Sequence, residues 1–263
     1  MRTGSLFWGS ILILIGGLLL LDNLGLLPVD LWGIFWPSLI ILIGLWTLWG
    51  VFFRRRPETE HANIPLEGAG RAHVRIHHGA GRLRVHAGAG AGDLAEGDFG
   101  GGLDVDTRRD GDTLSVRMRV PQQVWFPFSW GPGSSLDWDF GLSRDLPLNL
   151  EFETGANDSR IDLSELQVTD LRLSSGASST ELTFPARAGL TRAKISTGAA
   201  SVRVRLPEGV AARIRAGGGL ASITVDTARF PHSGAYYQSP DYDAAENKVD
   251  LDVETGVGSV DIR

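Results

Sequence analysis

The sequence predicts a membrane protein with an N-terminal transmembrane α-helical hairpin, followed by an all-β domain. For this domain we expect a single-stack β-solenoid of about 20-residue repeats. Three observations predict the fold class: residues 4–21 and 31–53 are uncharged and apolar, a glycine-centred phrase recurs in the C-terminal part, and apolar and charged residues alternate around each glycine. A β-sandwich of hairpins is the alternative for the β domain.

The two apolar runs carry a repeat, FWGSILILIG from Phe7 and FWPSLIILIG from Phe35. A helix needs about 20 mostly apolar residues to cross a bilayer, so transmembrane helices are expected over about residues 5–24 and 31–53. A cleaved signal peptide fits the first run less well, because no small-residue cleavage site follows it. Neither run contains an ionisable residue, which argues against a proton or ion pathway.

The charges that flank the apolar runs indicate a topology. Arg2 precedes the first run, and Arg54, Arg55 and Arg56 follow the second, whereas the connecting loop has Asp22 and Asp30 but no Lys or Arg. Cytoplasmic segments carry the excess of Lys and Arg. The protein is therefore expected to cross the cell membrane twice, with both termini and the β domain in the cytoplasm.

The remaining sequence suggests one further domain. We expect a hairpin unit at 1–53, a basic and polar linker at 54–70, and the β-solenoid at 71–263, interrupted by an aromatic insertion at 122–145 and a Tyr-rich insertion at 230–246. The chain contains no Cys. Disulfides, thiol catalysis and Cys-ligated zinc are therefore excluded.

Six phrases of the β domain align on a central glycine. The residues three and five positions before each glycine are apolar and the residue between them is charged, as in Ala193, Lys194 and Ile195. This alternation is typical of a strand with one buried face. We expect each glycine at a tight bend that requires a positive φ, and the long spacing before the last phrase indicates a doubled unit with an insertion. The glycines are Gly79, Gly155, Gly176, Gly198, Gly217 and Gly256.

Four stretches, two in each part of the chain, resemble known families. RDLPLNLEFETGANDSRIDLSELQVTDLRLSSGASSTELTFP and YYQSPDYDAAENKVDLDVETGVGSVDIR resemble the toast-rack type of β-repeat domain, and GSILILIGGLLLLDNLGLL with FWPSLIILIGL resembles the membrane module of LiaF-like proteins of the cell-wall-antibiotic response. The resemblance implies a membrane-anchored accessory that tunes an envelope-stress sensor kinase. The bilayer and such a membrane protein are the implied partners.

The chemistry-bearing residues do not form a recognisable catalytic, cofactor or metal pattern. Arginines alternate with the clustered histidines and would repel a divalent cation. The run HAGAGAGD lacks the Lys-Ser/Thr of a phosphate-binding loop. We therefore predict no catalytic, cofactor-binding or metal-binding residue, and no enzyme. The histidines considered are His73, His77, His78 and His86.

A basic face is expected close to the membrane, where anionic lipids attract Lys and Arg. Residues 88–170 are by contrast strongly acidic, so a nucleic-acid phosphate backbone would be repelled. The candidate lipid-facing residues are Arg54, Arg55, Arg56, Arg75, Arg82 and Arg84.

Aromatic residues gather in the two insertions. They either cap the ends of the solenoid or contact a partner, because Trp and Tyr are frequent binding hot spots. The candidate partner-contact residues are Trp125, Phe126, Phe128, Trp130, Trp138, Tyr236, Tyr237 and Tyr242.

The function predicted is that of a non-catalytic accessory or regulator that tunes a cell-envelope stress sensor through protein–protein contacts. One alternative is a membrane-tethered scaffold that assembles head to tail as a homo-oligomer. The outward row Arg172, Lys194 and Arg213 argues against it, because like charges are expected to stack there while Glu151 and Asp252 lie toward the ends. The other alternative is an envelope-facing domain that binds wall polymers.

Overall fold

The computed structural model describes residues 36–42, 44, 45, 59–121 and 136–263. The chain divides into two compact units, Met1–Arg54 and Arg55–Arg263. In the first unit the described residues are helical. Among the residues described, no helix has the length and apolar character needed to cross a membrane. The predicted helix at 5–24 and most of the predicted helix at 31–53 lie outside these residues.

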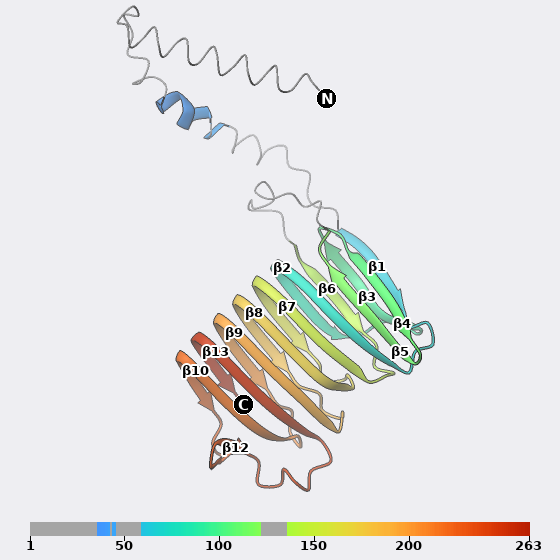
Figure 1. The fold of residues 1–263 in the computed structure, drawn as a ribbon, viewed down its shortest axis with the longest axis vertical. Helices are drawn as coiled ribbons and strands as arrows, with labels where there is room; N and C mark the ends of the chain where they lie inside the picture. Colours follow the sequence, from blue (N-terminus) through green and yellow to red (C-terminus); the bar gives the residue numbers. More distant parts are fainter. Residues whose placement is uncertain (1–35, 43, 46–58, 122–135) are drawn as a thin grey trace, which may run out of the picture. The chain divides into compact units, whose positions relative to one another are not determined.

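The second unit is a β domain whose strands belong to one continuous sheet (Figure 1). Its path runs β1-β3-β6-β2-β7-β8-β9-β13-β10-β12-β11, and β4 joins through β5, which also pairs with β2. The strands are β1 (Thr59–Pro65), β2 (Arg71–Ala87), β3 (Asp93–Gly100), β4 (Asp104–Asp110), β5 (Thr113–Arg119), β6 (Trp138–Leu142), β7 (Leu148–Asp162), β8 (Val168–Thr183), β9 (Leu190–Arg205), β10 (Ala211–Val225), β11 (His232–Ser233), β12 (Tyr236–Gln238) and β13 (Lys248–Ile262).

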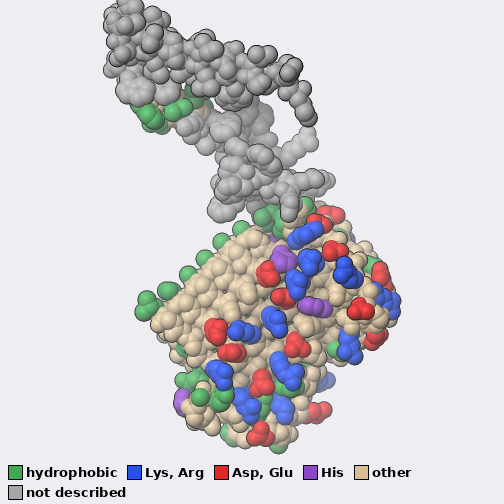
Figure 2. Space-filling model, in the orientation of Figure 1, with side chains coloured by type: hydrophobic (Ala, Val, Ile, Leu, Met, Phe, Trp, Pro, Cys, Tyr) green, Lys and Arg blue, Asp and Glu red, His purple; other side chains and the backbone are tan. Residues whose placement is uncertain are grey.

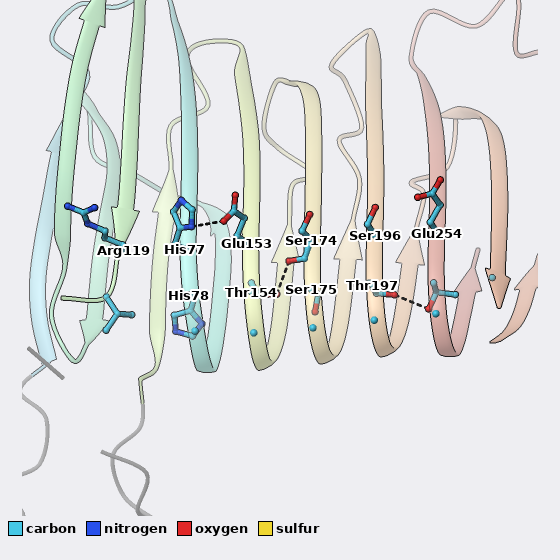
Figure 3. Close-up of a pocket in the computed structure, with 18 of the residues that line it drawn as sticks. His77, His78, Arg119, Glu153, Thr154, Ser174, Ser175, Ser196, Thr197 and Glu254 are labelled. Atoms are coloured by element: carbon cyan, nitrogen blue, oxygen red, sulfur yellow. Dashed lines mark hydrogen bonds and ion pairs between the residues drawn. The ribbon is translucent and has the colours of Figure 1, made fainter. Parts of the chain in front are cut away.

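The long strands β2, β7, β8, β9, β13 and β10 turn back at a central glycine, and Figure 3 shows several of these bends side by side. We call the residues before the bend the first arm and those after it the second arm. Both arms pair in parallel with the same neighbouring strand; β7 and β8 do so from Leu148 to Asp162. Buried residues of both arms, such as Leu150 and Ile161, belong to one hydrophobic cluster. The prediction of a β domain built from half-buried strands is therefore confirmed.

The order of the strands corrects the expected simple stack. β13 pairs in parallel with β9 on one side and with β10 on the other. The chain leaves one position empty after β9, forms β10, and fills the gap with its last strand. The outward charge row changes accordingly: Asp252 faces Lys194 and Arg215, so it does not lie toward an end and Arg213 does not continue the row.

The bend glycines form a row for a reason other than the one expected. None of them has a positive φ. A Cβ on Gly155 would instead lie 2.3 Å from the carbonyl oxygen of Gly79 in the preceding strand, and a Cβ on Gly198 would lie 2.8 Å from that of Gly176. The register also places Gly219, not Gly217, beside Gly256. Close stacking of neighbouring bends, not positive φ, therefore favours glycine at Gly155, Gly176, Gly198 and Gly256.

The regions between and beside the long strands add shorter strands at both ends of the sheet. β1 falls within the expected linker 54–70 and pairs with β3; only Ile64 of this strand is buried, so its sequence looks like a polar linker. β6 begins inside the expected aromatic insertion, of which residues 122–135 lie outside the described part. The Tyr-rich insertion contains β11 and β12, and β12 pairs with Arg213 and Ile214 of β10.

Candidate interaction site

A groove of about 1130 Å³ runs along the bends of the long strands. Parallel register brings equivalent residues of successive strands side by side, and Figure 3 shows them in two rows next to the bends. Beside the bend glycines, the groove is lined by an outer row of His77, Glu153, Ser174, Ser196 and Glu254, and by an inner row of His78, Thr154, Ser175, Thr197 and Thr255.

The outer row is charged at its ends and neutral in the middle. His77 Nδ1 lies 2.8 Å from a carboxylate oxygen of Glu153, and Lys194 Nζ lies 3.5 Å from one of Glu254. Between these pairs stand Ser174 and Ser196, whose hydroxyl groups have no hydrogen-bond partner within the described part of the chain. The middle of the groove therefore presents free hydroxyl groups and glycine backbone to a ligand.

The inner row is buried, and its hydroxyl groups form hydrogen bonds at the bends. The Thr197 hydroxyl of β9 donates to the Thr255 hydroxyl of β13 at 2.9 Å, whereas the Ser175 hydroxyl donates at 2.5 Å to that of Ser178, on the other side of the bend in the same strand β8. The first bond holds two neighbouring bends in register, and the second fixes the shape of one bend. The groove thus has a rigid floor.

His78 ends the inner row and is only 1% exposed. Its Nε2 lies 2.8 Å from the carbonyl oxygen of Leu136, which fits an Nε2–H donor, and its ring lies 5.2 Å from that of Trp138. Nδ1 has no partner among the described residues. Burial, the largest effect, lowers the pKa of His78, while the Leu136 carbonyl and the nearby Asp137 oppose that shift.

The free energy of unfolding is expected to fall as the pH drops below about 6.5, in part because of His78. The folded protein resists protonating this ring, whereas the unfolded chain takes up the proton near the ordinary pKa of 6.5. Denaturant titrations between pH 7.5 and pH 5 would measure the slope. The His78→Leu variant should show a shallower dependence than the wild type, and an unchanged slope would contradict the assignment.

Two predicted partner-contact residues are buried and belong to the core or to an end cap. Trp138 is 1% exposed and packs edge-on against Phe99, with ring centroids 5.2 Å apart. Tyr242 is 4% exposed, and its hydroxyl donates to Asp250. Burial, aided by this hydrogen bond, raises the pKa of Tyr242 to about 12. Neither side chain is available for a surface contact.

The other predicted aromatic residues divide into two groups. Tyr236 and Tyr237 are half-buried in β12, where the hydroxyl of Tyr236 accepts a hydrogen bond of 2.6 Å from Arg215. This contact attaches the Tyr-rich insertion to the outer side of β10, which fits the capping interpretation. Four residues lie outside the described part of the chain: Trp125, Phe126, Phe128 and Trp130.

The predicted basic face is largely neutralised. Arg75 and Arg82 each lie 2.6 Å from a carboxylate, that of Glu151 and Asp137 respectively, and Arg84 lies 3.4 Å from that of Asp139. Burial, the largest single effect, disfavours the charged form of Glu151, but the hydrogen bond from Arg75 and the charges around the carboxylate together outweigh it and lower the pKa of the carboxyl group. Figure 2 shows acidic and basic side chains interspersed over one face of the domain. Arg54, Arg55 and Arg56 lie outside the described residues.

Sequence reasoning missed the groove. Its two rows stand one and two positions before the glycines of five of the six aligned phrases, all except that of Gly217, and most of these residues carry hydroxyl or carboxylate groups. This recurring polar pair is the sequence signal that could have located the groove. Among the described residues, no group of three or more His, Asp or Glu side chains is placed to hold a metal ion.

Two family models match the chain. The LiaI-LiaF-like transmembrane region matches residues 6–48, and the N-terminal domain of toast_rack matches residues 53–205, more than half of the chain. The chain belongs to the toast_rack family. It is thus a membrane-associated, LiaF-like toast-rack protein, as the sequence resemblance indicated. Within the β domain, the toast_rack match extends through β9, and β10 to β13 lie beyond it.

A solved structure shares the fold of this toast-rack protein. A candidate cell adhesion protein from Clostridium sporogenes superposes with a TM-score of 0.71 at 19% identity, over 78% of this chain and 98% of the other. A candidate adhesin from Bacteroides fragilis has a TM-score of 0.28 at 8% identity, over 80% of this chain and 100% of the other, and this TM-score is too low to show a common fold. No curated protein matches the chain.

Proposed function

We propose that this toast-rack protein is a non-catalytic, membrane-anchored accessory that tunes a cell-envelope stress sensor through protein–protein contacts. Its membrane region matches the LiaI-LiaF-like type, and that region is joined directly to a toast-rack domain. In this proposal the helical hairpin lies beside the membrane helices of a sensor such as a kinase. The β domain faces the cytoplasm and binds a segment of the sensor or of a downstream protein.

The groove along the bends is the observation that carries the proposal. Its hydrogen-bonded inner row gives a rigid floor, and Ser174 and Ser196 offer unpaired hydroxyl groups at its centre. A preorganised surface loses little conformational freedom when a ligand binds. The two end carboxylates each already lie beside a basic side chain, His77 and Lys194, so they are poorly placed to act as a catalytic acid–base pair. The groove is therefore better suited to binding a partner protein than to catalysing a reaction.

Blocking the groove is expected to release the partner. The double variant Ser174→Arg, Ser196→Arg places two long cations at its centre, and pull-down of the full chain from mild detergent should then recover at least about tenfold less of a membrane partner. Ser179→Arg is the matched control, because Ser179 is exposed on the second arm of β8 and does not line the groove. Equal recovery with all three proteins, or no membrane partner with the wild type, would count against the proposal.

The alternative is an envelope-facing domain that binds wall polymers. The similarity to a candidate cell adhesion protein is the observation that favours it. Topology separates the two functions. The native chain has no Cys, so single cysteines at Asn23→Cys in the predicted loop and at the exposed Ser233→Cys in β11 can be labelled with a membrane-impermeant maleimide. In intact cells Asn23→Cys should label and Ser233→Cys should label only after lysis. The reverse pattern would favour wall-polymer binding.

A further inference from the structure

The second arm of β10 ends the sheet without a partner on its outer side. β13 pairs with β10 along both arms, whereas β12 covers its outer side only at Arg213 and Ile214, in the first arm. No described strand pairs with the outer side of residues 220–225. An open strand edge presents a row of free backbone N–H and C=O groups.

The core beneath this edge is incompletely covered. Ile223 stands in register with Val260 of β13, which stands in register with Val202 of β9. Val202 and Val260 are each 1% exposed, whereas Ile223 is only partly buried. Leu220, at the start of the same arm, is 82% exposed. Strands inside the sheet are covered by a neighbour on each side, whereas the second arm of β10 has a neighbour on one side. One additional strand would bury Ile223 as Val202 and Val260 are buried.

The edge also lacks the charges that usually protect an open strand. No Asp, Glu, Lys or Arg occurs from Ala216 to Val225. At the opposite end of the sheet, β4 has the sequence DVDTRRD and its residues from Asp106 onward are exposed. Charged side chains on edge strands disfavour pairing with another chain. The second arm of β10 is thus the end that permits an added strand.

We infer that this edge binds one extended segment of a partner protein by strand addition, the segment being uncharged over about five residues with apolar β-branched side chains at alternate positions. A single strand fits better than a second copy of this chain. β12 and β11 extend the sheet of first arms beyond β10, so a complete bent strand of another copy would meet them. The inference depends on the proposed function in one respect only: that function suggests which protein supplies the added strand.

A synthetic peptide tests the inference without knowledge of the partner. The probe copies residues 199–206, the second arm of β9 and the residue after it, with Arg203→Thr and Arg205→Thr so that it is uncharged along its side chains. The control peptide carries in addition Val202→Pro and Val204→Pro, which remove backbone donors. Fluorescence anisotropy with the full chain in mild detergent measures binding, and hydrogen exchange measures protection of the amides of residues 220–225.

The probe should bind the wild type and slow exchange in residues 220–225, whereas the proline peptide should do neither. Ile223→Lys places a charge on the core-facing side of the open edge, where the added strand would pack. It should weaken peptide binding at least about tenfold. Thr224→Lys adds the same charge on the exposed side of the strand, where it stays in solvent, and should weaken binding clearly less than Ile223→Lys does. The hydrogen-exchange result on the wild type holds even if the Ile223→Lys variant folds poorly.

Three results would overturn the inference: no added protection of residues 220–225, equal binding by the wild type and the Ile223→Lys variant, or protection that rises with protein concentration alone. The last result would assign the edge to a second copy. Partner capture is measured separately. Peptide binding without any captured membrane protein would leave the edge inference standing and refute the proposed function.

Discussion

Replacing Gly155 by alanine is expected to lower the free energy of unfolding by about 3 kcal/mol or more, because overpacking at a rigid contact is destabilising. The new Cβ would lie 2.3 Å from the carbonyl oxygen of Gly79. That oxygen belongs to the backbone of a neighbouring bend, so it cannot rotate away as a flexible side chain would. Urea denaturation of the full chain in mild detergent, followed by circular dichroism of the β strands, measures the change.

The row of bend glycines supplies its own control. At Gly79 a Cβ would meet nothing within 4 Å, so Gly79→Ala should be neutral or stabilise by up to about 1 kcal/mol by restricting the unfolded chain. The contact distances also predict an order of damage, with Gly155 first, then Gly256 at 2.6 Å, Gly198 at 2.8 Å and Gly176 at 3.1 Å. Equal effects of alanine at all five positions would show that conformational freedom, not close stacking, selects glycine there.

These glycines illustrate how much of the fold can be predicted from sequence. The alternation around them is a local property, so it correctly indicated half-buried strands such as β7 and β8. The reason for the glycines is not local. A carbonyl oxygen of the preceding strand excludes the side chain, and that contact exists only after the strands stack. Sequence spacing located the row but suggested positive φ as its cause.

The predictions of a basic face and of Trp138 as a surface contact were wrong for the same reason: each depends on contacts between strands that are distant in the sequence. Arg75 and Arg84 seemed to form a basic face because the carboxylates of Glu151 and Asp139 arrive from other strands. Trp138 occurs in a Pro- and Gly-rich stretch that looked like a surface loop, yet it fills the core beside Phe99. The groove was missed because its polar pairs acquire a common surface only through the register of successive strands.

The place of β13 shows a second kind of limit. Sequence order suggested that each unit stacks on the one before it, but β13 lies between β9 and β10. Nothing in the local pattern distinguishes a strand that extends the stack from one that fills an earlier gap. The consequence for stability is large, because β13 is the strand through which β10 joins the rest of the described sheet.

Substituting Val253 by aspartate is therefore expected to detach two strands and not one. Val253 is fully buried in the first arm of β13, between Ile195 of β9 and Ala216 of β10. Among the described residues no Lys or Arg side chain is buried in the core to pair with a carboxylate there, so the variant should lose at least about 3 kcal/mol of stability. Hydrogen exchange should then show loss of protection in β10 as well as in β13, while β7 and β8 stay protected.

Val257→Asp is the matched control, because it makes the same chemical change in the same strand at a side chain that is 52% exposed. Exposed substitutions usually change stability by about 0.5 kcal/mol or less, so β10 and β13 should keep their protection. If β10 stayed protected in Val253→Asp while β13 lost its protection, β10 would have to be held by its cap of β11 and β12. In that case the hydrogen bonds of Arg213 and Arg215 to the cap, to Gln238 and Tyr236, would matter more than strand pairing with β13.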